Sequence, residues 1–292
     1  MKKKHKLNLN KFLVTVFTFF AFLFSNTTKS LEKLKISSIP DESITELHKK
    51  FLPLKDYLEE QLNLEIEFVP VSDYASVVEA LSTNKIDLAW LGGFTFIQAF
   101  HRSNGKVEPI IQRQKDERFS SVFIVSKNDN FSNINDLKDQ PFSFGSPSST
   151  SGHIMPRYFL MKKNINPELF FNPIAFSGAH DATLYSVLSG KVKGGVLNSV
   201  VWKKLINEKP KLSESLEVLY ETQSYYDYNW TIRTEIPDSI KNKIINAFLS
   251  LNKNNSKHQK ILKLQRAEKY IRTEKKNYDN ILDAAKSAKI IN

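Results

Sequence analysis

The chain has 292 residues, with 42 Lys and Arg against 31 Asp and Glu, and it contains no cysteine. The lack of cysteine excludes a disulfide framework and a lipid-modified N-terminal cysteine. Residues 1–30 hold six of the lysines and no acid, so the remaining chain has 36 basic and 31 acidic residues. A surplus of five charges is compatible with an anionic ligand but is a weak basis for nucleic-acid binding.

The N-terminal segment has the pattern of a secretory leader. Five lysines precede Lys29, and the run from Phe12 to Phe24 is apolar over 13 residues. Such a run is short for a membrane span and typical of the apolar part of a signal peptide. We therefore expect residues 1–30 to be a signal peptide and the mature protein to be periplasmic, with an uncleaved N-terminal anchor as the alternative.

Strand and helix patterns alternate through the first part of the mature chain. Leu34–Ile39, Ile66–Val71 and Ile86–Gly93 are apolar, strand-like runs, while Leu47–Leu62 repeats its leucines at helical spacing. A second helix is predicted after Asp73, because Tyr74, Val77, Val78 and Leu81 share one helical face. This βαβαβ order predicts a mostly parallel sheet covered by helices.

A second set of elements follows. Strands are predicted at Ser121–Lys127 and Val192–Asn198, and helices at Ile154–Lys163 and His180–Ser189. Polar connectors at 112–120 and 221–229 would let the C-terminal helices return to the first half. The pattern predicts an α/β fold of two lobes joined by a two-strand hinge, with lobe 1 comprising residues 31–117 plus 228–292 and lobe 2 comprising 118–227.

A cluster of four hydroxyls, Ser148 to Ser151, stands where a predicted strand turns into a predicted helix. The first N–H groups of a helix are unpaired and together carry about half a positive charge. Hydroxyl donors at the same point would make an anion-binding site. One helix-capping hydroxyl is the simpler alternative, but capping does not need four. Pro156 lacks an N–H, so the helix should start late or bend there, and Arg157 is expected to face solvent.

Three segments together resemble the phosphonate-binding PhnD family: YASVVEALSTNKIDLAWLGG, PSSTSGHIMPRYFL and SGAHDATLYSVLSGKVKGGVLNS. The resemblance covers roughly Leu34 to Phe248. Members of the PhnD family are periplasmic solute receptors of ABC transporters with a two-lobed class II binding-protein fold. The resemblance implies capture of a small phosphorus oxyanion by hinge closure and delivery to a membrane permease and its ATPase. It implies no catalytic residue, metal, cofactor or nucleic acid.

The resemblance also assigns ligand-binding residues. Tyr74 corresponds to a tyrosine whose hydroxyl reaches the oxyanion from the first lobe, and Ser149, Thr150 and Ser151 to the helix-terminal donors of the second lobe. His180 corresponds to a histidine that bonds a ligand oxygen, and Asp227 to a carboxylate near the second hinge strand.

Two positions that are expected beside the ligand pocket differ from those of the aminoalkylphosphonate binders. Leu91 stands where those receptors have an aromatic residue, and Val200 stands where they have a glutamate that pairs with the ligand ammonium. A buried ammonium without a counter-charge costs several kcal/mol. We therefore expect a ligand without an amino tail, with phosphite or methylphosphonate ranked ahead of phosphate. Asp227 would favour an oxyanion that carries a proton and would disfavour sulfate.

Other classes of function remain as alternatives. The sequence has no nucleophile-elbow, zinc-protease or phosphate-loop motif, although His180 near a serine turn leaves a phosphatase-like enzyme open. A ligand-sensing signalling receptor would have the same fold, and so would a receptor for an unrelated metabolite, because function resides in the site.

Overall fold

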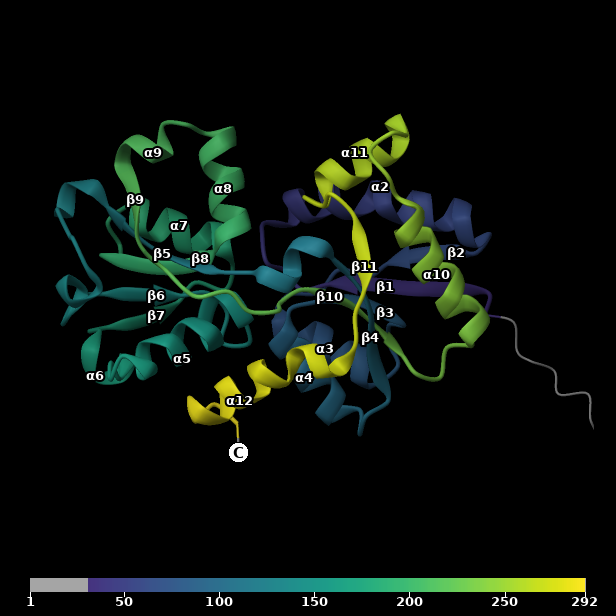
Figure 1. The fold of residues 1–292 in the computed structure, drawn as a ribbon, viewed down its shortest axis with the longest axis horizontal. Helices are drawn as coiled ribbons and strands as arrows, with labels where there is room; N and C mark the ends of the chain where they lie inside the picture. The colour runs from purple at the N-terminus through teal and green to yellow at the C-terminus, as the bar shows by residue number, and fades with distance from the viewer. Residues whose placement is uncertain (1–30, 292) are drawn as a thin grey trace, which may run out of the picture. The chain divides into compact units, whose positions relative to one another are not determined.

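The computed structural model describes residues 31–291, and those from Lys33 onward form one compact unit. The signal peptide predicted over 1–30 lies outside the described residues. The unit contains two sheets, one in each lobe (Figure 1). No helix among residues 31–291 is both long enough and apolar enough to cross a membrane.

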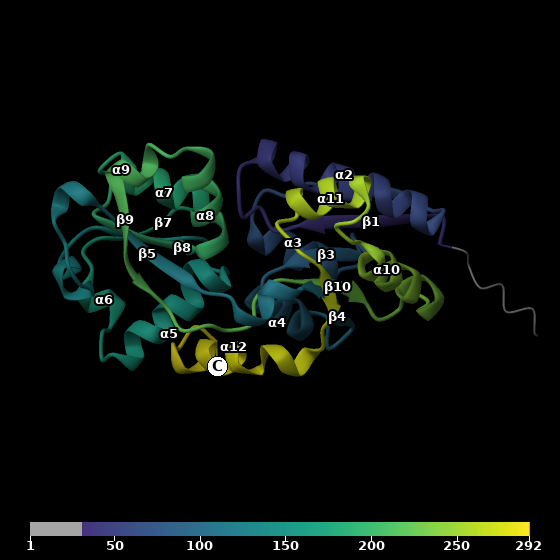
Figure 2. The same cartoon turned by 45° about the horizontal axis from the view of Figure 1, so that its top comes forward.

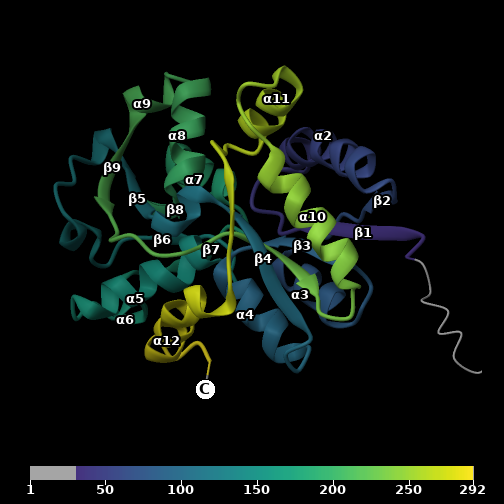
Figure 3. The ribbon, with the colours of Figure 1, turned by 45° about the vertical axis from the view of Figure 1, so that its right-hand side comes forward.

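Lobe 1 is built on a six-stranded sheet in the order β11-β4-β10-β3-β1-β2. Its strands are β1 (Lys33–Ser38), β2 (Glu65–Phe68), β3 (Leu88–Leu91), β4 (Val107–Arg113), β10 (Asn229–Arg233) and β11 (Tyr270–Arg272). Its helices are α2 (Ile44–Leu62), α3 (Tyr74–Ser82), α4 (Gly93–Arg102), α10 (Asp238–Ser250), α11 (Ser256–Leu264) and α12 (Asp279–Ser287). Helices α10 and α11 pack against α2 (Figure 3).

Lobe 2 is built on a five-stranded sheet in the order β7-β6-β8-β5-β9. Its strands are β5 (Ser121–Ser126), β6 (Phe142–Phe144), β7 (Ile174–Phe176), β8 (Gly194–Asn198) and β9 (Leu216–Glu221). Its helices are α5 (Met155–Lys162), α6 (Pro167–Phe170), α7 (His180–Leu188), α8 (Ser199–Glu208) and α9 (Leu212–Ser215).

Both sheets are mixed rather than uniformly parallel, which refines the predicted fold. In lobe 1, β1 pairs in parallel with β2 and β3, but β10 is antiparallel to both of its neighbours, β3 and β4. In lobe 2, β6 pairs in parallel with β7 and β8, but β5 is antiparallel to β8 and β9. The inserted strand is in each case the first strand after the chain crosses between lobes, so it enters its sheet from the opposite end.

The apolar patterns in the sequence become the cores. Leu47, Phe51, Leu54 and Leu58 form the buried stripe of α2, as the helical spacing predicts. In β5, successive side chains alternate between two apolar clusters, with Val122 and Ile124 under α7 and α8, and Phe123 and Val125 on the opposite face. Strand β5 is therefore apolar on both faces, because both faces are covered.

Two chain segments cross between the lobes side by side. The first runs through the short helix η2 (Gln114–Arg118) and the second through residues 222–228. Phe119 and Tyr225 exchange backbone hydrogen bonds of 2.8 and 2.9 Å, and the Asp227 N–H donates to the Asp116 carbonyl at 3.0 Å. We propose this paired segment as the hinge. Helix α12 also contacts both lobes, because it packs against α4 and α5 (Figure 2).

Candidate functional site

The candidate site collects the starts of helices from both lobes. Tyr74 is the first residue of α3 and Gly93 the first of α4, while Thr150 begins the short helix η5 (Thr150–Ile154) and His180 begins α7. Each helix directly follows a strand of its sheet, so the helix starts gather where the carboxyl ends of the strands meet. The structure brings all six predicted ligand-binding residues into buried positions, with none more than 3% exposed.

The hydroxyl cluster forms an unusually wide turn. The Ser149 hydroxyl accepts a 2.9 Å hydrogen bond from the Gly152 N–H, as an N-cap does. The Ile154 N–H donates to the Ser149 carbonyl at 3.0 Å, and the Met155 N–H donates to the Thr150 carbonyl, so both bonds span five residues. Turns of this width occur often at functional sites. Ser149 can therefore cap the helix and also bind an anion. Capping uses one lone pair of its oxygen and leaves its O–H free to donate.

Pro156 explains how this turn is fixed in place. Because Pro156 has no N–H, the Gly152 carbonyl is free, and it accepts a 2.8 Å hydrogen bond from the Gly145 N–H at the end of β6. The Ser151 carbonyl accepts a 2.7 Å bond from the Ser121 hydroxyl on β5. The carbonyls that a regular helix would use internally thus tie the turn to two strands of lobe 2.

Two glycines permit close contacts at the site. A Cβ atom on Gly152 would lie 2.9 Å from Ser149 Oγ and 3.2 Å from His180 Cε1. A Cβ atom on Gly92 would lie 2.9 Å from Thr150 Oγ1. Any side chain at these positions would push the hydroxyl turn away from α7 or from lobe 1.

The N-terminus of α4 in lobe 1 binds residues of lobe 2 and of the hinge. The Phe94 N–H donates to Thr150 Oγ1 at 3.0 Å, and the Gly93 N–H donates to Asp227 Oδ1 at 3.1 Å. Because the Thr150 oxygen accepts from the backbone, its own O–H remains a donor for a ligand. The two lobes are in contact at the site in this structure.

His180 is held by groups on three sides. Its backbone N–H donates to the Asp41 carbonyl in lobe 1 at 3.0 Å. Its ring nitrogen Nδ1 accepts a hydrogen bond from the Asn198 backbone N–H at 3.4 Å. The other ring nitrogen, Nε2, lies 3.4 Å from the Tyr228 hydroxyl. Burial lowers the pKa of His180 to about 4. The ring is therefore neutral at neutral pH, and the accepting role of Nδ1 places its proton on Nε2.

Asp227 is a buried carboxyl whose pKa is raised, whereas the pKa of His180 is lowered. Burial, and then the nearby charge of Asp116, raises the pKa of Asp227 to about 7, although the Gly93 N–H opposes the shift. The Thr150 and Ser151 hydroxyls also lie beside it. Its Oδ2 atom is buried without a hydrogen-bond partner among the described residues. Asp227 can therefore exchange a proton near neutral pH.

Several other polar atoms here are buried and unpartnered within residues 31–291, namely the Tyr74 hydroxyl, Ser38 Oγ and Asp41 Oδ1. Burial, and then the charge of Asp41, raises the pKa of Tyr74 well above its ordinary value, so its hydroxyl keeps its proton. A buried polar group without a partner costs about 1–3 kcal/mol. Such atoms together mark a place where a polar ligand would supply the missing bonds.

The two predicted neighbours of the pocket lie in different surroundings. Leu91 is fully buried at the end of β3, directly before Gly92. Val200 is half-buried in the first turn of α8 and lines a surface pocket with Lys115, Arg118 and Lys203. Val200 therefore lies outside the buried group of donors.

Sequence reasoning missed some site residues and misplaced others. Ser38 ends β1, Asp41 follows it shortly after, and Asn198 ends β8, so their only signal is a position at or near a strand end. The expectation that Arg157 faces solvent is wrong. Arg157 is buried and donates to His153 Nε2 at 3.0 Å, and it pairs with Glu168. Within the described chain, no three His, Cys, Asp or Glu side chains are arranged to hold a metal ion.

Known proteins are similar to this chain in sequence and in fold. The chain is 34% identical over 285 residues to the probable ABC transporter phosphite-binding protein PhnD1 of Prochlorococcus marinus (strain MIT 9301), which covers 94% of this chain and 96% of that protein. It is 27% identical to the phosphonates-binding periplasmic protein of Escherichia coli (strain K12), over 75% of this chain and 66% of that protein.

A solved structure of PhnD1 from Prochlorococcus marinus (MIT 9301) in complex with methylphosphonate superposes with a TM-score of 0.85. That match has 32% identity and covers 90% of this chain and 100% of that chain. The family model for the phosphonate ABC transporter, periplasmic substrate-binding protein, matches residues 36–278. The chain therefore belongs to the family of periplasmic substrate-binding proteins of phosphonate ABC transporters.

Proposed function

We propose that this protein captures phosphite or a small phosphonate such as methylphosphonate by closing its two lobes around the anion. One observation carries the proposal: hydroxyl and N–H donors from both lobes meet at a buried place where the Tyr74 hydroxyl has no hydrogen-bond partner among residues 31–291. A small tetrahedral oxyanion has the acceptor oxygens that such donors need. Membership of an ABC transporter family means that a membrane permease and an ATPase complete the system.

The donors are uncharged groups. Ser149 and Thr150 each accept a backbone N–H through their oxygen, which leaves both O–H groups to donate. The neutral His180 ring carries its proton on Nε2, so that atom can donate as well. Hydrogen bonds from such donors to an anion are charge-assisted and strong when water is excluded. Affinity therefore depends on closure, which also allows release when the lobes part.

The carboxyl of Asp227 supports selection by protonation state. With a pKa of about 7, it can donate from Oδ2 when protonated or accept a proton from a P–OH group when ionised. Sulfate offers no proton and would face an ionised Asp227 unfavourably. Partial neutrality also makes Asp227 a poor counter-ion for an ammonium group. This supports a ligand without an amino tail, in agreement with the departure at Leu91.

The names of the relatives point in the same direction. PhnD1 of Prochlorococcus marinus is described as phosphite-binding and was solved with methylphosphonate. At 34% identity over 94% of the chain, transfer of this ligand class is a reasonable proposal. We rank phosphite and methylphosphonate above phosphate for the present chain.

We also propose that the site does not catalyse hydrolysis. A catalytic serine needs a base within hydrogen-bond reach. His180 instead contacts Asn198 and Tyr228, and no hydrogen bond joins it to a serine hydroxyl within residues 31–291. The homologues are transport proteins rather than enzymes. Incubation with a phosphonate monoester should give no product, and steady turnover would contradict this assignment.

The ligand class can be tested by titration calorimetry of purified mature protein with phosphite, methylphosphonate, 2-aminoethylphosphonate, phosphate and sulfate. We expect one phosphite or methylphosphonate per chain, and at least about 100-fold weaker binding of 2-aminoethylphosphonate and sulfate. Tightest binding of sulfate or 2-aminoethylphosphonate would overturn the proposed ligand class. Absence of binding by any of the five would overturn the proposed function.

Family membership makes the protein periplasmic, and we propose that residues 1–30 direct its export as a cleaved signal peptide. Mass spectrometry of the protein from a periplasmic extract should give a chain that begins near residue 31. Recovery of the full-length chain from the membrane fraction would instead support the N-terminal anchor.

A further inference from the structure

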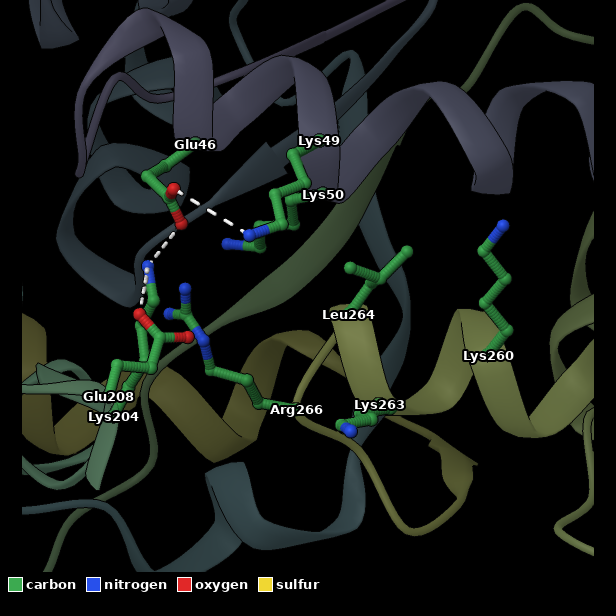
Figure 4. Close-up of a pocket in the computed structure, with 9 residues that line it drawn as sticks. All are labelled: Glu46, Lys49, Lys50, Lys204, Glu208, Lys260, Lys263, Leu264 and Arg266. Atoms are coloured by element: carbon green, nitrogen blue, oxygen red, sulfur yellow. Dashed lines mark hydrogen bonds and ion pairs between the residues drawn. The ribbon is translucent and has the colours of Figure 1, made fainter.

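A basic groove lies outside the anion site, on the surface where α2, α8 and α11 meet. A hollow of about 440 Å³ is lined there by Lys49 and Lys50 from α2, Lys204 from α8, and Lys260 and Lys263 from α11. Figure 4 shows these side chains surrounding the hollow, with Arg266 between α11 and α8. Glu46 and Glu208 are the acids that line it.

The groove continues beyond this hollow in two directions. A second hollow of about 550 Å³ shares Lys260 and Lys263 with the first, and a third of about 430 Å³ shares Lys204 and Arg266 and extends to the hinge. The cations that line the three hollows are Lys49, Lys50, Lys115, Arg118, Lys203, Lys204, Lys253, Lys260, Lys263 and Arg266. The acids are Glu46, Glu208, Glu221 and Glu268.

Most of the positive charge excess of the mature chain lies in the groove. Its ten lining cations and four lining acids leave an excess of six positive charges, and the buried acids Asp41 and Glu42, which pair with Lys50, Lys204 and Arg266, reduce this excess to four. Residues 31–292 have 36 basic and 31 acidic side chains, an excess of five. The rest of the chain is therefore close to neutral, and the positive potential is concentrated on this one surface.

Both lobes contribute to the groove. Lys204 on α8 of lobe 2 pairs with Glu42 at 2.9 Å and with Glu46, both in lobe 1, and Arg266 of lobe 1 pairs with Glu42 at 2.7 Å. These ion pairs hold the two sides of the groove together. Because the groove crosses between lobes, its charges have this arrangement only when the lobes are in contact as they are here.

Three lysines of the groove are free to bind a partner. Lys203 on α8, and Lys260 and Lys263 on α11, are exposed and make no ion pair with any described residue. Lys204 and Arg266, by contrast, are engaged with Glu42. The buried pairs thus shape the groove, while the exposed lysines offer unneutralised charge on both of its sides.

We infer that this groove is the docking surface for an acidic, protruding segment of the membrane permease, and that it identifies the closed form of the binding protein. The inference rests on the proposed function, because closure on a ligand is what brings α8 against α2 and α11. Complementary charge speeds docking and fixes its register. The concave shape favours a protruding loop or helix over a flat lipid surface, which could reach only the rims.

The test is ligand uptake by proteoliposomes that contain the permease and ATPase of this protein's transporter. The triple variant Lys203→Glu, Lys260→Glu, Lys263→Glu should reduce uptake and ligand-stimulated ATP hydrolysis at least about tenfold, because acidic groups would then face each other. Its calorimetric affinity for methylphosphonate should stay within about twofold of wild type, because none of the three residues lies at the anion site.

A matched control changes the same charge elsewhere. Lys85→Glu, Lys138→Glu, Lys191→Glu alters three exposed lysines that line none of the three hollows, and it should transport normally. Equal loss in both triple variants, or normal transport by the groove variant, would overturn the docking surface. Groove-dependent binding to anionic phosphatidylglycerol vesicles with normal transport would also overturn it. Failure of wild-type protein to bind methylphosphonate or phosphite would instead count against the proposed function.

Discussion

The two lobes share one design but contribute different parts of the site. If β11 is set aside, the orders β4-β10-β3-β1-β2 and β9-β5-β8-β6-β7 are the same arrangement, each with one antiparallel strand inserted. In lobe 2 the donor turn is fixed by its own hydrogen bonds through Gly152 and Ser121. In lobe 1 the Tyr74 hydroxyl and Ser38 Oγ have no hydrogen-bond partner in the described part of the chain. We therefore propose that lobe 2 is preorganised for an anion and that lobe 1 completes the shell.

This difference suggests an order of events. We propose that the anion first binds the donors of lobe 2, because most of the bonds that fix these donors lie within lobe 2, apart from those of Thr150 with Phe94 and of the His180 backbone with Asp41. Closure then adds the N-terminus of α4 and the Tyr74 hydroxyl. Preorganised donors lose little entropy on binding, so lobe 2 should account for most of the affinity and lobe 1 for the remainder.

The largest expected effect is on the lobe 2 donors. Thr150→Ala should weaken binding of methylphosphonate about 100-fold, because a charge-assisted hydrogen bond and the Phe94 N–H contact are both lost. Ser149→Ala should have a similar effect. Titration calorimetry measures both.

Tyr226→Phe is the matched control for hydroxyl removal, because Tyr226 lies near Tyr278 and is only half-buried. It should change affinity less than about twofold. Equal losses for Tyr226→Phe and Thr150→Ala would contradict the assignment of the hydroxyl turn as the main anion site.

The next effect concerns the hinge carboxyl that faces both lobes. The folded protein holds the pKa of Asp227 at about 7, above the ordinary value of 3.8. The folded state thus binds more protons than the unfolded state between these values, and the stabilising effect of the neutral carboxyl is lost as pH rises. Relative to Asp227→Asn, ligand-free wild type should lose about 2–3 kcal/mol of unfolding free energy between pH 5 and pH 8.

Urea unfolding of both proteins at a series of pH values measures this difference. Burial of His180, whose pKa falls to about 4, acts in the opposite direction below pH 6.5, but it is present in both proteins and cancels. Asp56→Asn, at an exposed site on α2, should follow the wild-type curve. A constant difference between wild type and Asp227→Asn across this range would show that Asp227 has an ordinary pKa.

A smaller effect should come from the ion pairs that join the lobes. Lys204→Met removes the bonds to Glu42 and Glu46 but leaves Glu42 paired with Arg266. We expect about tenfold weaker ligand binding, because closure becomes less favourable while the donors stay intact. Lys203→Met, one residue away and exposed, should bind as wild type. Unchanged affinity in Lys204→Met would mean that the bridge does not favour closure.

The smallest effect is expected at Val200. A glutamate there would face Lys115, Arg118 and Lys203 in the surface pocket and would pair with them. Val200→Glu should therefore raise the affinity for 2-aminoethylphosphonate by no more than about threefold. A gain of a hundredfold or more, measured by calorimetry, would place Val200 beside the ligand tail after all.

Local patterns predicted the elements of the fold better than their pairing. The buried stripe Tyr74, Val77, Val78 and Leu81 is visible in the sequence because helical periodicity is local. The antiparallel insertion of β5 and β10 is not, because strand neighbours are chosen by long-range packing. The contact of α12 with α5 was missed for the same reason.

The candidate site could be proposed from the sequence where a chemical cluster coincides with a helix start. Thr150 and His180 are of this kind, since both begin a helix and both are buried, as is Tyr74. Their role as ligand-binding residues stays a prediction. Asp41 and Asn198 were missed because a single polar residue after a strand has no distinctive signal. Their place at the site follows from the order of strands in two sheets, which no local pattern encodes.

The most direct test of closure on uncharged donors is a crystal structure of the mature protein with methylphosphonate. The phosphonate oxygens should lie about 2.6–3.0 Å from the hydroxyls of Ser149, Thr150 and Tyr74, with the lobes in contact. A ligand bound in the basic groove, or bound with the Thr150 hydroxyl pointing away from it, would contradict this mechanism.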